Sequence, residues 1–145
     1  MFTIENIIDT CRDFNLGKLK KGTIEDFFKS LKISRRLSLY KKGMIVSLAM
    51  IDFDLLEMSP GYEEETAIDI EEIYVTRFIL SYVETSEDTY RINTDDIDDL
   101  YNAGFVDYVL DYCSRDFDVL KRMFENAIKF KYINLFGNMV GNVSS

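Results

Sequence analysis

The stretch SLYKKGMIVSLAMIDFDLLEM, residues 38–58, contains the longest apolar run of the chain and decides its fold class. Ser38 is a suitable N-cap, and Ser59-Pro60-Gly61 ends the pattern. Between them, apolar residues recur at helical intervals: Leu39, Ile45, Val46, Leu48, Ala49, Ile51, Phe53, Leu55 and Leu56. The stretch predicts a long helix with apolar residues on most sides. We therefore expect it to be the most buried element of the protein.

Two further helices are predicted before this stretch. Thr3 is the expected N-cap of the first, which covers residues 4–16 and ends at Gly17. Thr23 is the expected N-cap of the second, whose apolar residues are Ile24, Phe27, Phe28 and Leu31. Residues 33–37 are predicted to be a linker or a short turn.

Three helices are predicted after the stretch. Asp69 and Glu72 form a capping pair at the start of a helix that runs to residue 83, although its β-branched residues leave a strand open. Thr94 is the expected cap of a short acidic helix that ends at Gly104. Residues 105–113 add one or two helical turns. Ser114 then caps a last helix, residues 115–136, which Gly137 ends.

These patterns predict an all-α protein, a compact bundle of five to seven helices with short loops and an extended C-terminal tail. A single proline in 145 residues agrees with long uninterrupted helices. Residues 1–136 are expected to form one helical domain. Residues 137–145 are expected to be a tail that is flexible or becomes ordered against a partner subunit.

Charge is divided along the chain. Residues 1–45 hold ten Lys/Arg and five Asp/Glu, residues 46–120 hold three and twenty, and residues 121–145 hold four and one. Basic and acidic regions of this kind favour contacts with other macromolecules. We expect contacts between subunits, in a homo-oligomeric ring or with neighbouring proteins, and consider nucleic acid a secondary partner because the net charge is −9.

Three groups of residues are the candidates for these contacts. They are the basic residues Lys18, Lys20, Lys21, Arg35, Arg36, Lys41 and Lys42, the acidic residues Asp95, Asp96, Asp98 and Asp99, and the apolar tail residues Phe136, Met139, Val140 and Val143. A solvated helical face is the alternative for the two charged groups, and a disordered terminus is the alternative for the tail.

The sequence offers few groups for catalysis or for metal binding. Histidine, the commonest general base and metal ligand, is absent from the chain. No phosphate-binding loop is found, and the acidic run at 95–99 lacks the spacing and the glycine of a calcium loop. We therefore expect no catalytic residue, no cofactor and no metal. An enzyme with paired carboxylates stays a third and weaker hypothesis.

The two cysteines, Cys11 and Cys113, are far apart in the sequence and belong to no CxxC pair. They predict two free thiols in a reducing intracellular setting. The first residues lack the pattern of a signal peptide, and residues 44–51 are too few to cross a bilayer. We expect a location in a virion or in the host cytoplasm, without secretion by a signal peptide and without membrane contact.

The order of the segments resembles a known class of proteins. The segments are LSLYKKGMIVSLAMIDF, then IDIEEIYVTRFILSYVE, then DDIDDLYNAGFVDYVLDYCSRDFDVLKRMFENAIKF and a Gly-Asn tail. In this order they resemble small, mostly helical virion and assembly proteins of tailed bacteriophages. The resemblance covers residues 37–143 and implies a neck, connector or tail component present in many copies around a ring. It carries over no catalytic residue.

The leading hypothesis is therefore a non-enzymatic structural or assembly protein, a head–tail neck or tail component. The alternative is an acidic inhibitor that mimics nucleic acid and blocks a host DNA- or RNA-binding protein.

Overall fold

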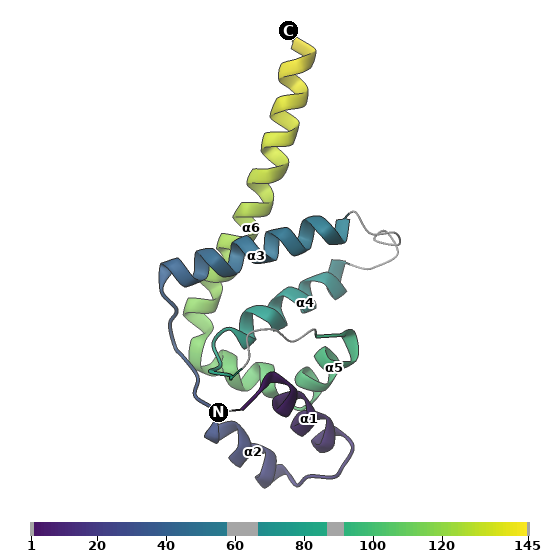
Figure 1. Cartoon of the computed structure of the whole chain (residues 1–145), viewed down its shortest axis with the longest axis vertical. Coiled ribbons are helices and arrows are strands. Elements are labelled where there is room, and N and C mark those ends of the chain that lie inside the picture. Colours follow the sequence, from purple (N-terminus) through teal and green to yellow (C-terminus); the bar gives the residue numbers. More distant parts are fainter. Residues whose placement is uncertain (1, 58–66, 87–91, 145) are drawn as a thin grey trace.

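The computed structural model describes residues 2–57, 67–86 and 92–144, and these form an all-α fold (Figure 1). The helices of the described ranges are α1 (Ile4–Asn15), α2 (Lys21–Ser30), α3 (Leu39–Glu57), α4 (Ala67–Leu80), α5 (Thr94–Asn102) and α6 (Phe105–Ser144). Both the predicted fold class and the predicted range of helix numbers are confirmed. The expected helix stop at residues 59–61 lies outside the described residues.

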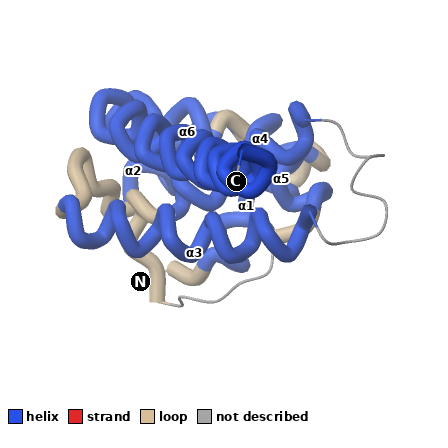
Figure 2. The backbone as a smooth tube through the Cα atoms, turned by 90° about the horizontal axis from the view of Figure 1, so that it is seen from above, coloured by secondary structure: helices blue, strands red, loops and turns tan. Residues whose placement is uncertain are grey.

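Three helices, α3, α4 and α5, pack against α6. Helix α1 lies against α5, whereas α3 and α4 both pack against α6 (Figures 1 and 2). Aromatic rings join elements that are distant in the sequence: the ring centroids of Phe28 and Tyr108 are 5.2 Å apart, and those of Tyr74 and Phe124 are 4.8 Å apart. Tilted ring pairs of this kind add to the stability that apolar burial provides.

Two helix caps are as the sequence predicts. The Thr3 hydroxyl accepts a hydrogen bond from the Asn6 N–H at 3.0 Å, and the Asn6 side chain accepts one from the Thr3 N–H. This reciprocal capping satisfies two backbone donors at the start of α1. The Ser38 hydroxyl likewise accepts a hydrogen bond from the Lys41 N–H at 3.1 Å, before the first turn of α3.

Three other predicted helix starts are wrong by a few residues. Helix α2 begins at Lys21, so Thr23 lies inside the helix and is not its cap. Helix α4 begins at Ala67, two residues before Asp69. Helix α5 is capped by Asn93, and Thr94 is its first residue. Neighbouring Thr, Asn and Asp residues have similar capping preferences, so propensity alone does not choose among them.

Glycines make two of the turns, as predicted. Gly17 follows α1 with φ of 78°, and Gly104 separates α5 from α6 with φ of 82°. This left-handed conformation costs residues with a side chain about 1 kcal/mol or more. Gly104 therefore allows the chain to leave α5 and to enter α6 immediately.

Helix α6 corrects the prediction for the C-terminal third of the chain. It is one helix from Phe105 to Ser144, so Ser114 does not cap a new helix and Gly137 does not end it. An interior glycine costs only about 1 kcal/mol relative to alanine, and serine costs less. No proline follows Gly137 to forbid the next turn. Beyond α3 the end of α6 projects from the body as a single rod (Figure 1).

A short extended segment joins α2 to α3, in agreement with the predicted linker. Ile33 forms an isolated antiparallel bridge with Val83. The Ser34 N–H donates to the Tyr82 carbonyl at 2.8 Å, and the Glu84 N–H donates to the Lys32 carbonyl at 2.9 Å. These bonds hold the linker against the chain that follows α4 and so fix the position at which α3 begins.

Candidate protein-interaction surface

One side of α3 exposes a row of large apolar residues, which we call the outer face of α3. Its members are Tyr40, Met44, Leu48 and Ile51; Leu39, the first residue of the helix, is also exposed but lies on another side. From Tyr40 onward the spacing is four, four and three residues, which places the side chains on one helical face. The exposed fraction is 79% for Tyr40 and 62% for Leu48. α3 lies along one edge of the body (Figure 2) and packs against α6.

This exposure corrects the expectation that α3 is the most buried helix. The apolar pattern includes Leu39, Leu48 and Ile51 in its buried stripe, yet each of them is exposed. The same pattern does not single out Tyr40 and Met44 as surface residues. The signal that points to an exposed face is the presence of apolar residues on most sides of the helix, because a helix on the outside of a small bundle has neighbours on one side only.

The opposite side of α3 is buried and contains a charged residue. Val46 and Ala49 pack into the core, and Lys42 is buried beside them with 6% of its surface exposed. The Lys42 Nζ lies 2.5 Å from Asp116 Oδ1 of α6. Lys42 is therefore committed to an internal ion pair, and its assignment as a surface contact residue is wrong.

The Asp116 carboxylate connects three parts of the chain. Its Oδ2 accepts hydrogen bonds from the Leu37 N–H at 3.0 Å and from the Tyr82 hydroxyl at 2.8 Å. Burial raises the pKa of Asp116, but the bonds from Lys42, Leu37 and Tyr82 outweigh burial and hold this pKa below its ordinary value of 3.8. Asp116 is therefore ionised at neutral pH, and its charge anchors the inner face of α3 to α6.

The hydroxyl of Tyr82 is correspondingly held in its protonated form. Burial, the hydrogen bond to Asp116 and the charge of that carboxylate together raise the pKa of Tyr82 well above its usual range. A protonated hydroxyl and an ionised carboxylate are the forms that this hydrogen bond requires. The cluster has the arrangement of a structural anchor.

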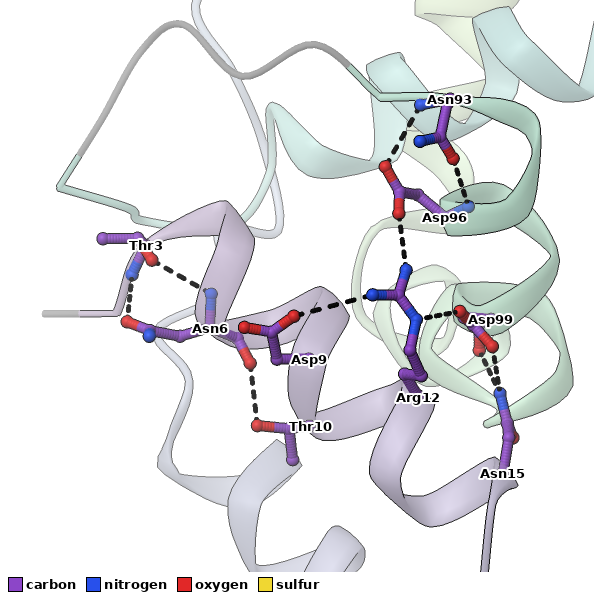
Figure 3. A network of polar contacts seen from close by, with 9 residues as sticks. All are labelled: Thr3, Asn6, Asp9, Thr10, Arg12, Asn15, Asn93, Asp96 and Asp99. Atoms are coloured by element: carbon purple, nitrogen blue, oxygen red, sulfur yellow. Dashed lines mark hydrogen bonds and ion pairs between the residues drawn. The ribbon is translucent and has the colours of Figure 1, made fainter.

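The acidic run of α5 is divided between an internal network and the surface. Asp95 and Asp98 are exposed, as predicted for a solvated turn. Asp96 is buried, and Asp99 lies at the contact with α1 (Figure 3). Asp96 also completes the α5 cap, since its carboxylate accepts from the Asn93 N–H while the Asn93 side chain accepts from the Asp96 N–H.

Arg12 of α1 is the partner of both inward carboxylates. Its Nη2 donates to Asp96 Oδ1 at 2.7 Å, and its Nε donates to Asp99 Oδ2 at 2.8 Å (Figure 3). Asn15 adds a hydrogen bond from its side chain to the Asp99 carbonyl at 3.0 Å. The prediction that Asp96 and Asp99 face an outside partner is thus wrong, because Arg12 uses these charges to join α1 to α5.

The basic candidates other than Lys42 are exposed, but the structure does not gather them into one cluster. Lys18, Lys20 and Lys21 follow α1 and begin α2, whereas Arg36 and Lys41 lie around the start of α3. Arg35 is exposed with its guanidinium carbon 5.6 Å from the centre of the Tyr112 ring on α6. This contact, a cation–π interaction, ties the linker to α6.

The tail candidates Phe136, Met139, Val140 and Val143 all belong to the projecting end of α6. Their side chains lie outside the part of the chain that the structure describes. Their function in subunit contacts stays a prediction.

Both cysteines are buried and free of disulfides, as expected. Burial and the Asp99 charge raise the pKa of the Cys11 thiol to about 12, and burial and the Asp116 charge raise the pKa of the Cys113 thiol to about 11. Both thiols are therefore protonated at neutral pH, whereas a nucleophilic cysteine reacts as the thiolate.

The described residues lack two further features. No group of three His, Cys, Asp or Glu side chains among them is arranged to hold a metal ion. None of the helices, as far as they are described, combines the length and the apolar character that crossing a membrane requires.

Comparison of the chain with protein-family models, with curated proteins and with solved structures finds no match.

Proposed function

We propose that this protein is a non-enzymatic assembly subunit that binds other protein subunits through the outer face of α3. The observation that carries the proposal is the exposed row of Tyr40, Met44, Leu48 and Ile51 on a helix whose other side buries Val46 and Ala49. Single exposed apolar residues are common on soluble proteins, but contiguous apolar patches mark interaction sites.

The free energy gained by burying the apolar side chains of this face supports a specific protein interface. Burying one large apolar side chain contributes about 1.5–3 kcal/mol. Four neighbouring side chains of this kind supply enough to offset part of the entropy that is lost on association. The inner anchor also holds α3 in place through Lys42 and Asp116, so the outer face is presented on a fixed helix.

The projecting end of α6 offers a second contact region. Positions 136, 139, 140 and 143 follow the spacing of a single helical face, and α6 extends beyond the body (Figure 1). A subunit with one contact region on its side and another on a projecting helix suits a multi-subunit assembly. Together with the resemblance in segment order, these two contact regions support a role as a component of the neck or tail of a tailed bacteriophage, located in the virion.

The nucleic-acid mimic is a weaker candidate. Mimicry requires carboxylates that face solvent, and Arg12 already uses Asp96 and Asp99. Asp116 is likewise used internally by Lys42, so the exposed carboxylates of the mimic are Asp95 and Asp98 of α5 and Asp107, Asp111 and Asp118 of α6.

The proposal is tested by incorporation into particles. The gene would be deleted from its phage and supplied in trans as the wild type, as Leu48→Lys or as Leu16→Lys. Leu16 is a matched control because it is 63% exposed, against 62% for Leu48, and lies at the end of α1. We expect mass spectrometry of purified virions to detect the wild type and Leu16→Lys, and to find Leu48→Lys strongly depleted.

A wild-type protein that is absent from the particles would overturn the virion role. Equal incorporation of all three proteins would overturn the role of the outer face of α3.

A further inference from the structure

We propose that the partner of the outer face of α3 is the same face of a second copy of this chain, with the two α3 helices antiparallel. This inference rests on the proposed function, that this face binds protein, and names its partner. The order of apolar and charged residues along α3 is complementary to itself when one helix is reversed.

The apolar residues match in the reversed direction. With a two-fold axis close to residue 46, Tyr40 lies opposite Ile51 of the second copy, and Met44 lies opposite Leu48. Each apolar side chain then meets another, and the row is covered from its first turn to its last. The flexible Met44 and the Leu48 side chain at the centre can adapt their conformations to fill the space between the two helices.

The charges at the ends of the row select the antiparallel direction. Lys41 is exposed at the N-terminal end, and Asp52 is half-exposed at the C-terminal end. Reversal of one helix brings Lys41 beside Asp52 of the other copy at both ends, whereas a parallel pair places like charges at the same level. Asp52 also pairs with Arg77 of its own chain, and 47% of its side chain remains exposed for a second contact.

The same charge order disfavours other partners. A membrane surface attracts helices whose apolar face has basic residues on both flanks. Here one end of the face carries Lys41 and the other carries Asp52, in a chain with a net charge of −9. A strongly acidic or strongly basic protein would be repelled at one of the two ends.

The first experiment measures oligomeric state by analytical ultracentrifugation of the full chain from about 1 to about 100 μM. We expect the wild type and Leu16→Lys to form dimers with the same dissociation constant. Leu48→Lys should weaken the dimer about tenfold or more, since a central apolar contact becomes a buried charge. Unchanged helical circular dichroism of Leu48→Lys would show that folding is retained.

The second experiment tests direction and register by disulfide formation. Tyr40→Cys and Ile51→Cys proteins are mixed and oxidised, and crosslinked peptides are identified by mass spectrometry. The antiparallel pair predicts a crosslink between the two different variants. It predicts few crosslinks between two Tyr40→Cys chains. In the antiparallel pair, the two Tyr40 positions are offset by eleven residues of helix, which is about 16 Å. Cys11 and Cys113 are buried, and the oxidised wild type controls for them.

A wild type that is monomeric throughout this range would overturn the second copy as partner. If Leu48→Lys were nevertheless lost from virions, the proposed function would stand with a different partner protein. Crosslinks between two Tyr40→Cys chains would overturn the antiparallel direction. A crosslinked antiparallel dimer that is absent from virions would support this inference and overturn the virion role.

Discussion

The two faces of α3 each carry residues that are unusual for their surroundings. The inner face buries a lysine, Lys42, whereas the outer face exposes Tyr40, Leu48 and their apolar neighbours. The buried charge is tolerated because Asp116 pairs with it, and the carboxylate in turn has hydrogen-bond partners. The exposed apolar row has no such compensation among the described residues. The inner face serves the fold, whereas the outer face is the one that we propose for association.

The largest effect is expected from breaking the inner face. Asp116→Ala removes the acceptor of Lys42, of the Leu37 N–H and of the Tyr82 hydroxyl together. Loss of one partner of a buried ion pair leaves a charge without compensation, so the free energy of unfolding should fall by about 3 kcal/mol. Urea unfolding followed by circular dichroism measures this loss. A change below about 1 kcal/mol would show that Asp116 does not anchor α3.

Acid should also lower the unfolding free energy, because it protonates Asp116 and weakens the contacts of the inner face. The pKa of Asp116 is lower in the folded chain than its ordinary value of 3.8. Its contribution to stability is therefore complete above the unfolded pKa and is lost as the pH falls through the folded pKa. The wild type should lose more unfolding free energy than Asp116→Asn between about pH 6 and about pH 2. Parallel pH profiles of the two proteins would argue against the anchor.

A smaller gain of stability is expected within α3 itself. Gly43 lies inside the helix, and a Cβ built there has no other atom within 4 Å. Gly43→Ala should raise the unfolding free energy by about 0.5–1 kcal/mol, because alanine loses less backbone entropy in a helix. Gly104→Ala is the matched control. A Cβ there is equally unobstructed, but φ of 82° strains it, so stability should fall. Urea unfolding would distinguish the two signs.

The smallest effect on folding is expected at the outer face. Leu48→Lys should change the unfolding free energy of the dilute chain by less than about 0.5 kcal/mol, because Leu48 is exposed. Val46→Ala on the inner face is the contrast, with an expected loss of about 2 kcal/mol. Equal losses at both positions would mean that the two faces of α3 do not differ in their contribution to the fold.

The sequence by itself determined where most helices lie and how several of them begin or turn. Thr3, Ser38, Gly17 and Gly104 act locally, through hydrogen bonds or backbone conformations that involve a few neighbouring residues. Composition alone also limits the chemistry, since the chain has no histidine and only two cysteines, which are not spaced as a redox pair. Local patterns of this kind depend little on distant parts of the chain.

Only the tertiary structure decided which side of each element faces outward. Arg12 is 84 residues from Asp96, and Lys42 of α3 pairs with Asp116 of α6. These pairs turn predicted surface charges into internal ones. The outer face of α3 stays exposed because α6 covers one side of a helix that is apolar on most sides. A sequence pattern records which residues are apolar, but burial depends on which neighbours the fold brings to each side.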